Sequence, residues 1–162
     1  MTTTLTHIRY LFSLLEGTWT GDGRGEFPGV TSFAYHETLR FTRRDDNCLT
    51  YEQKTQKLYD GQTEYVPSHV ETGSICILEN GGLELISEQA GRSEVLIGSI
   101  EPVDALIRIH FASKSITNDP RMISSARTFE LEGDTLRYEM EMLTTKVESL
   151  TPHVKMTLHR LD

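Results

Sequence analysis

Polar and apolar residues alternate along most of the chain, as expected for strands that bury one face. The start is different, because the apolar residues between His7 and Leu15 recur at helical spacing and predict one short helix. Turn-forming sequences such as Asp60-Gly61 and Glu132-Gly133-Asp134 separate the alternating segments at hairpin spacing. Strands are predicted at residues 32–43, 49–58, 69–78, 82–89, 93–100, 105–113, 126–131, 135–143 and 154–161.

One more strand precedes these, because Trp19, the only tryptophan, shares odd parity with Gly17, Gly21, Gly23 and Gly25. Glycines along one face of a strand let another backbone or a flat ligand come close. A large ring beside them suits a plug at the closed end of a barrel. The pattern predicts an all-β fold: a closed up-and-down antiparallel barrel of about ten strands, with a short N-terminal helix. Residues 1–162 are expected to form one domain.

Parity also predicts which side chains face the barrel interior. The expected interior includes one carboxylate, Glu37, which needs a polar partner or water if it is buried. A barrel of this size has room for one small organic ligand. The predicted inward residues of three strands are Phe33, Tyr35, Glu37, Leu39 and Phe41, then Leu85, Ser87 and Gln89, then Leu136, Tyr138, Met140 and Met142.

Charge and cysteine content narrow the function classes. With 24 acidic and 16 basic residues the net charge is −8, which disfavours binding to nucleic acid and to anionic lipid surfaces. Cys48 and Cys76 form no C-x-x-C pair, so we expect no disulfide framework and a reducing, cytoplasmic setting. The sequence shows neither a secretory signal nor an apolar run long enough to cross a bilayer, and we expect a soluble protein.

Motifs for nucleophilic, zinc-dependent, phosphate-binding and dinucleotide-dependent catalysis are missing. An enzyme activity would therefore depend on a cofactor. His153 is the histidine of most interest, because it follows Pro152 just before a predicted strand. Alternation with Val154 and Met156 would point it away from the core, although a residue before a strand can turn over the barrel mouth. From the residues alone, such a histidine is more often a surface residue than a ligand.

Five landmarks occur in order along nearly the whole chain. They are the Gly-x-Trp-x-Gly-x-Gly run from Gly17 to Gly23, the sequence Pro-Ser-His-Val-Glu-Thr-Gly at 67–73, Gln-Ala-Gly at 89–91, Phe-Glu-Leu at 129–131, and Thr144-Thr145 ahead of Pro152-His153. Together they resemble the nitrobindins, small heme-binding β-barrels that are similar in shape to lipocalins and fatty-acid-binding proteins.

The resemblance implies a ferric b-type heme protein that binds nitric oxide and isomerises peroxynitrite to nitrate. His153 matches the family's axial ligand to the heme iron, a suitable role for a neutral imidazole. His69 matches a residue at the pocket edge, and Arg121 matches a basic position that could pair with a heme propionate. Ser68 departs from the methionine expected there, which makes the cavity locally more polar. The other residues expected to contact the cofactor are Phe33, Gln89, Met142, Gly17, Trp19, Gly21 and Gly23.

Two other functions remain open at this stage. The same barrel could carry a fatty acid or another apolar ligand without iron, with Glu37, Gln89 and Arg121 anchoring a polar head. It could also be a sensor in which bound heme reports nitric oxide to a partner. Four other histidines match no position of the family pattern and are expected to be structural or exposed, namely His7, His36, His110 and His159. The oligomeric state is left open, a homodimer included.

Overall fold

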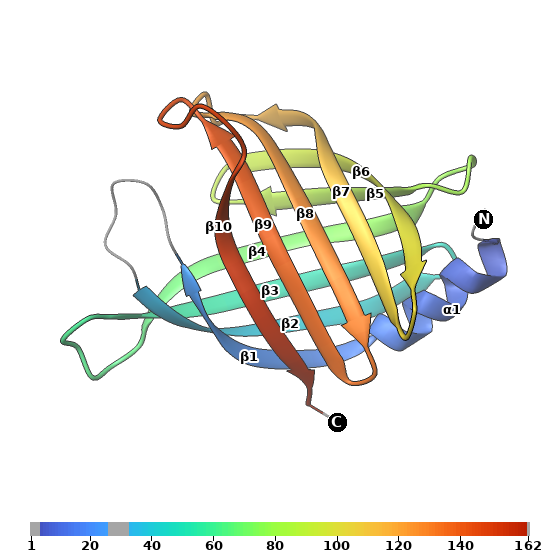
Figure 1. Ribbon diagram of the computed structural model, residues 1–162, viewed down its shortest axis with the longest axis horizontal. Helices are drawn as coiled ribbons and strands as arrows, with labels where there is room; N and C mark the ends of the chain where they lie inside the picture. Colours follow the sequence, from blue (N-terminus) through green and yellow to red (C-terminus); the bar gives the residue numbers. More distant parts are fainter. Residues whose placement is uncertain (1–3, 26–32, 162) are drawn as a thin grey trace.

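One N-terminal helix is followed by ten antiparallel strands that close into a barrel, as the sequence pattern predicts (Figure 1). The computed structural model describes residues 4–25 and 33–161. Neighbouring strands pair in sequence order, and β1 closes the barrel against β10. The elements are α1 (Leu5–Leu15), β1 (Gly17–Gly25), β2 (Phe33–Asp45), β3 (Cys48–Tyr59), β4 (Val66–Ile77), β5 (Leu83–Gln89), β6 (Arg92–Val103), β7 (Leu106–Thr117), β8 (Met122–Glu132), β9 (Thr135–Thr144) and β10 (Thr151–Arg160).

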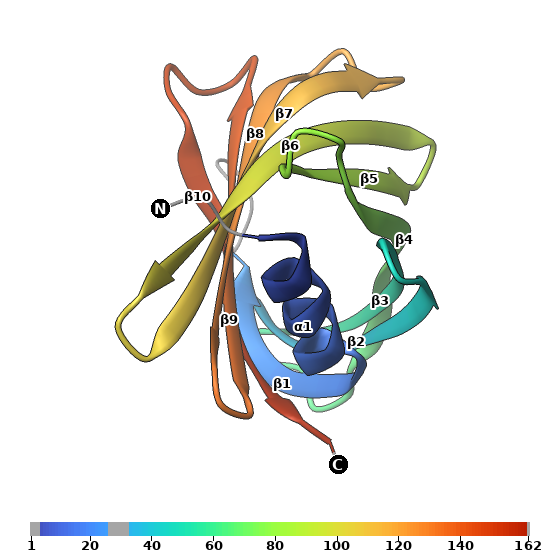
Figure 2. The same ribbon diagram turned by 90° about the vertical axis from the view of Figure 1, so that its right-hand side faces the viewer.

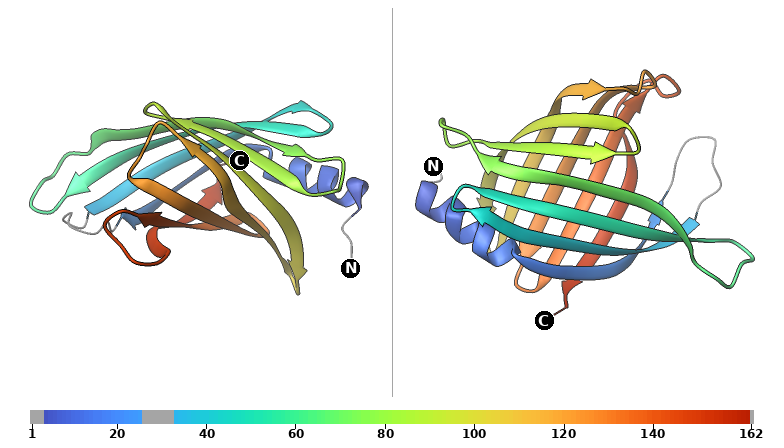
Figure 3. Two further views of the ribbon diagram at one scale, coloured as in Figure 1. Left: turned by 90° about the horizontal axis from the view of Figure 1, so that it is seen from above. Right: turned by 180° about the vertical axis from the view of Figure 1, so that it is seen from behind.

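Several strands are longer than the alternation predicts. The first residues of β4, from Val66 to Ser68, are exposed, so they show no inward and outward pattern to detect. The β3–β4 hairpin extends beyond the barrel wall (Figure 3). Strand ends that leave the barrel are held by hairpin hydrogen bonds rather than by a buried face.

Helix α1 lies across one end of the barrel (Figure 2). It begins two residues earlier than predicted, because the Thr4 side chain caps its N-terminus by accepting a hydrogen bond from the His7 amide. Its buried residues are those that its spacing predicts, namely Ile8, Leu11, Phe12 and Leu15. No helix in the described part of the chain is long and apolar enough to cross a membrane.

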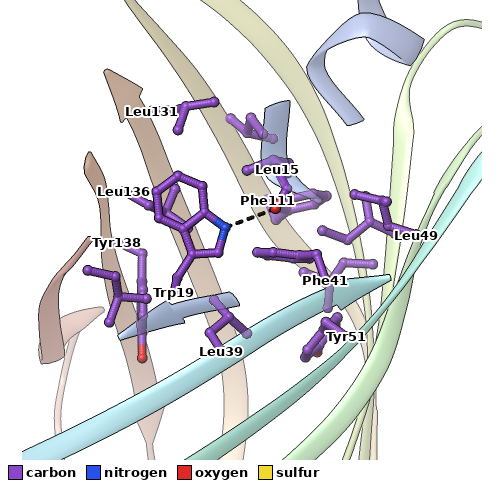
Figure 4. Packing of buried hydrophobic residues seen from close by; sticks show 14 of the residues in the cluster. Leu15, Trp19, Leu39, Phe41, Leu49, Tyr51, Phe111, Leu131, Leu136 and Tyr138 are labelled. Carbon is purple, nitrogen blue, oxygen red and sulfur yellow. Dashed lines mark hydrogen bonds between the residues drawn. The ribbon is translucent and has the colours of Figure 1, made fainter. Parts of the chain in front are cut away.

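Trp19 fills the interior beneath this helix, as predicted for a plug at the closed end. Its side chain is fully buried, and its indole Nε1 donates a hydrogen bond to the Leu15 carbonyl oxygen at 2.9 Å (Figure 4). The ring packs among Leu136, Leu39 and other core residues. Trp19 therefore joins β1 to the helix that covers this end.

The glycines of β1 serve the seam between β1 and β10. A Cβ at Gly21 would lie 2.1 Å from the Thr157 carbonyl oxygen, and one at Gly23 would lie 2.0 Å from the Met156 sulfur. Two kinds of close neighbour were expected at this face, another backbone or a flat ligand, and β10 supplies the first of them. Contact between these glycines and a cofactor stays a prediction. Gly25 is part of β1, and Glu26 to Pro28, which follow it, lie outside the described residues.

The two cysteines form a disulfide, contrary to the expectation from the sequence. Cys48 on β3 lies directly opposite Cys76 on β4, with the Cα atoms 4.2 Å apart and the two sulfurs bonded. The spacing of the two residues gave no sign of a pair, because the strand register brings them together across 28 positions of sequence. The cysteines accordingly no longer support the prediction of a reducing setting.

Candidate functional site

A cavity of about 480 Å³ occupies the barrel end opposite α1. Strand β2 enters the barrel at this end and runs toward α1, so its first inward residues face the cavity and its later ones form the core. The volume is in the range of sites for small organic ligands and cofactors. The lining side chains are Phe33, Tyr35, Glu37, Gln53, Thr55, Lys57, Ser68, His69, Gln89, Ala90, Arg92, Asp119, Arg121, Met122, Tyr138, Met140, Met142, Thr144, Thr145, Lys146, His153 and Val154.

His153 lines this cavity because β10 contains a bulge. Pro152 pairs with Glu141 and Val154 pairs with Met140, so His153 is the extra residue of the ladder. The shift reverses the simple parity, and the side chain of His153 is buried with only 4% of its surface exposed. The alternation by itself pointed this ring away from the core and only allowed it to turn over the barrel mouth, because the bulge that turns it inward has no signature in the alternation.

The imidazole of His153 is held in one orientation by its own strand. Its Nδ1 lies 2.6 Å from the Thr151 carbonyl oxygen. A carbonyl only accepts hydrogen bonds, so Nδ1 carries the proton and donates it. In the neutral ring the lone pair then belongs to Nε2, which is the arrangement seen in histidines that ligate metals.

His69 and Arg121 lie at the outer part of the cavity, as predicted. The His69 Nε2 atom is 3.6 Å from Glu71 Oε1, and about a third of its side chain is exposed. Arg121 is largely exposed and pairs with Asp119, with Nε 3.1 Å from Oδ1. Hydrogen bonds from Arg121 and Arg92 lower the pKa of Asp119, and they outweigh the effect of burial, which would raise it.

The rim and the floor of the cavity differ in charge. Four cationic side chains, Lys57, Arg92, Arg121 and Lys146, and one acidic side chain, Asp119, lie among the outer lining residues. The innermost lining carboxyl is Glu37, which is fully buried. The rim therefore attracts anions locally, although the whole chain carries a net charge of −8.

Glu37 forms a polar triad with Gln53 and Tyr138 at the floor. The Tyr138 hydroxyl and the Gln53 Nε2 both donate to Glu37 Oε1, the latter at 2.9 Å, and Gln53 also donates to the Tyr138 oxygen at 2.7 Å. Glu37 Oε2 has no hydrogen-bond partner among the described residues. Burial raises the pKa of Glu37 to about 7, and the two hydrogen bonds only partly offset it. A buried carboxylate at this position was expected to need a polar partner or water, and the structure supplies two donors, both to the same oxygen.

A buried ionic network lies next to this triad, and the sequence analysis missed it. The Arg127 guanidinium is 2.6 Å from Glu71 Oε2 and 3.1 Å from Glu94 Oε2, and all three side chains are buried. Burial alone would raise the pKa of Glu71, but the Arg127 charge and hydrogen bonds from His69, Arg127 and Tyr51 outweigh it and hold the pKa well below its usual value. The sequence did contain a sign that Arg127 faces the barrel interior, because it alternates in step with the apolar residues Phe129 and Leu131 on the same strand.

Other predicted contacts divide into two groups. Phe33, Gln89 and Met142 line the cavity, and Gln89 donates to Glu94 at 2.9 Å. Within the described part of the chain, Gly17, Trp19, Gly21 and Gly23 are not part of its wall. The structure therefore brings His153, His69, Arg121, Gln89, Met142 and Phe33 to one cavity and leaves the glycine-tryptophan strand in the seam and core.

Known proteins are similar to this chain in both sequence and fold. Residues 10–160 match the family described as the THAP4-like, heme-binding beta-barrel domain. Peroxynitrite isomerase 1 of Mycolicibacterium paratuberculosis is 34% identical over 150 residues, covering 90% of each chain. A protein of Arabidopsis thaliana named peroxynitrite isomerase Rv2717c is 35% identical, covering 92% of this chain and 86% of its own.

A solved structure gives the same result for the fold. The crystal structure of Rv2717c from M. tuberculosis superposes with a TM-score of 0.84 at 28% identity, covering 94% of this chain and 96% of that one.

Proposed function

The chain belongs to the THAP4-like family of heme-binding β-barrels, and from that premise we propose that it is a heme-dependent peroxynitrite isomerase. In this proposal the cavity would hold a ferric b-type heme, His153 would bind its iron, and peroxynitrite would be converted to nitrate. Nitric oxide binds at the same site. The names of the relatives support the reaction, and the residues of this cavity support the place where it occurs.

The observation that carries the proposal is the arrangement of His153. A buried imidazole that faces a cavity and donates from Nδ1 to a backbone carbonyl presents Nε2 as a donor to a metal. Phe33, Met140 and Met142 give the same cavity apolar walls that suit a macrocycle. The donor chemistry and the walls therefore fit a b-type heme.

The remaining residues would serve binding and exclusion of water. Lys57, Arg92, Arg121 and Lys146 place positive charge at the rim, where propionates and an anionic substrate would arrive. The walls formed by Met140 and Met142 limit access of water to the interior. When bound, the heme iron supplies the Lewis-acid chemistry for rearranging the peroxo bond of peroxynitrite.

Replacing His153 with alanine tests the ligand assignment. We expect His153→Ala to lose the saturable, one-to-one shift in Soret absorbance when the chain is titrated with hemin, because the variant has no imidazole donor at this position. The control is His159→Ala, since His159 is on the same strand but exposed, and its titration should match that of the unmodified chain. A full Soret band in His153→Ala after gel filtration would refute the assignment.

The fatty-acid carrier is the weaker alternative. One of its proposed anchors, Glu37, is unsuited to a carboxylate, because Glu37 is itself a buried acid. The hemin titration separates the two functions, since a carrier would show no His153-dependent shift.

A further inference from the structure

The floor of the cavity is a defined polar layer. Glu37, Gln53 and Tyr138 are the innermost cavity-lining residues of β2, β3 and β9. The next inward residues on these strands, such as Leu39 and Tyr51, face a separate void of only about 20 Å³. A molecule that enters the cavity therefore meets this triad at its deepest point.

The triad offers acceptors to such a molecule. Tyr138 uses its only hydroxyl proton on Glu37, and Gln53 directs its amide nitrogen to Glu37 and Tyr138. What remains on the triad is the Gln53 carbonyl oxygen and Glu37 Oε2, which is buried and has no hydrogen-bond partner among the described residues. The Tyr35 hydroxyl, which also lines the cavity, is likewise buried without a partner there and can donate or accept a hydrogen bond. A buried carboxylate oxygen in this state is costly unless a ligand or a proton satisfies it.

The buried carboxyls near the floor outnumber the buried guanidinium groups, although the partly buried Arg92 also lies 3.6 Å from Glu94. Among the described residues, the buried carboxyls are Glu37, Glu71 and Glu94, whereas Arg127 is the only buried guanidinium. Arg127 directs its terminal nitrogens to Glu71 and Glu94, and no hydrogen bond joins it to Glu37 among the described residues. An anionic head group at the floor would be repelled, and a cation would be attracted.

We propose that this floor is a subsite for an organic ammonium group, carried by a small ligand whose apolar part packs against Phe33, Met140 and Met142. An ammonium has three donors for the acceptors of the triad, and its positive charge balances the excess of buried carboxylates. The inference does not depend on the proposed isomerase activity, because it rests on the floor and not on His153. It also excludes a fatty-acid head from this position.

Calorimetric titration of the full-length chain, prepared without hemin, tests the subsite. At pH 8 we expect octylammonium to bind one-to-one and at least tenfold more tightly than octanol, and octanoate to bind least. Glu37→Gln should weaken octylammonium binding at least tenfold and leave octanol binding unchanged. Gln has nearly the same shape as protonated Glu, so the variant is expected to fold, and unchanged octanol binding together with an unchanged circular dichroism spectrum checks that the cavity is intact.

The matched control is Glu139→Gln, which removes a carboxylate next to Tyr138 in sequence but on the outer face of β9, where it pairs in register with Lys155. It should bind octylammonium as the unmodified chain does. Octanoate binding as tight as octylammonium, or octylammonium binding unaffected by Glu37→Gln, would overturn the proposal.

The pH dependence gives a second measurement. Octylammonium affinity should rise between pH 6 and pH 8 in the unmodified chain, because the cation favours the ionised form of Glu37, and this part of the rise should vanish in Glu37→Gln. The groups around Glu37 are Tyr35, Tyr51, Gln53, Glu71, Arg127 and Tyr138. His69 and His153 face the same cavity, so the comparison between the chain and the variant isolates Glu37. An identical pH profile in both would contradict the inference.

Discussion

Two buried glutamates show how strongly a single residue depends on its surroundings. Glu37 is stabilised by hydrogen bonds from neutral groups, so burial dominates and raises its pKa to about 7. Burial also acts on Glu71, but a guanidinium in contact with it holds its pKa well below the usual value. A glutamate side chain therefore gains and loses its proton near neutral pH at position 37 and stays ionised at position 71.

Glu37 should make the barrel less stable as the pH rises. Its pKa is 4.5 in the ordinary state and about 7 in the fold, so the folded chain keeps a proton that the unfolded chain loses first. The free energy of unfolding should fall between these two pH values, by at most about 3 kcal/mol, and should not change further above them from this group. Urea unfolding at pH 5 and pH 8 measures the effect.

Glu37→Gln is the comparison for this effect, because it cannot ionise. It should be more stable than the unmodified chain at pH 8 by about 1–3 kcal/mol, with a much smaller difference at pH 5. Glu71 contributes in the opposite direction, with stability that is lost as the pH falls, but it is common to both proteins and cancels. A difference that does not change with pH would show that Glu37 does not titrate in this range.

At the level of elements, the closure of the barrel depends on how closely β1 approaches β10. Five residue pairs define this seam, and Gly21 and Gly23 lie where β10 leaves no space for a side chain. The seam also joins the two ends of the sequence, so no short hairpin holds it in place. Its stability rests on the fit of the two strands.

Gly21→Ala should therefore destabilise the barrel by about 1–3 kcal/mol, because the added Cβ would collide with the Thr157 backbone and the strands must separate to admit it. Thermal and urea unfolding measure the loss. Gly82→Ala is the control, since a Cβ there meets first the end of the Asn80 side chain, at 3.1 Å, and the cost should be clearly smaller. Equal losses in the two variants would show that the seam tolerates a side chain.

At the level of the whole molecule, the disulfide links β3 to β4 at the barrel end covered by α1. Cys48 and Cys76 are 28 residues apart, and a cross-link of that length restricts the unfolded chain. Strands β3 and β4 are consecutive in sequence and already pair as a hairpin. The disulfide therefore strengthens a strand pairing that exists without it. Its effect is expected on stability and not on the fold.

Reduction of the disulfide should lower the free energy of unfolding by roughly 3 kcal/mol without changing the far-ultraviolet circular dichroism of the folded chain. Urea unfolding with and without dithiothreitol tests this. A variant with both Cys48→Ala and Cys76→Ala should resemble the reduced chain and should not respond to dithiothreitol. A response of that variant would mean that the reductant acts elsewhere.

Part of the candidate site could be predicted from the sequence, some residues from the family resemblance and others from the alternation along the strands. His153, His69 and Arg121 were found through the resemblance, and the structure places all three at the cavity. Parity placed Glu37 and Tyr138 inside but gave no sign that they bond to each other across 101 positions of sequence. Arg127 was missed, although its parity with Phe129 and Leu131 could have revealed it.

The sequence by itself determined the class of fold, because alternation, turn residues and one helical stripe are local consequences of which faces are buried. It also determined the family, through landmarks spread along the chain. Only the tertiary structure decided the Cys48–Cys76 pair, the bulge that turns His153 inward and the partners of the buried charges. Each of these depends on strand register across the barrel, and register is a relation between distant segments that local patterns do not contain.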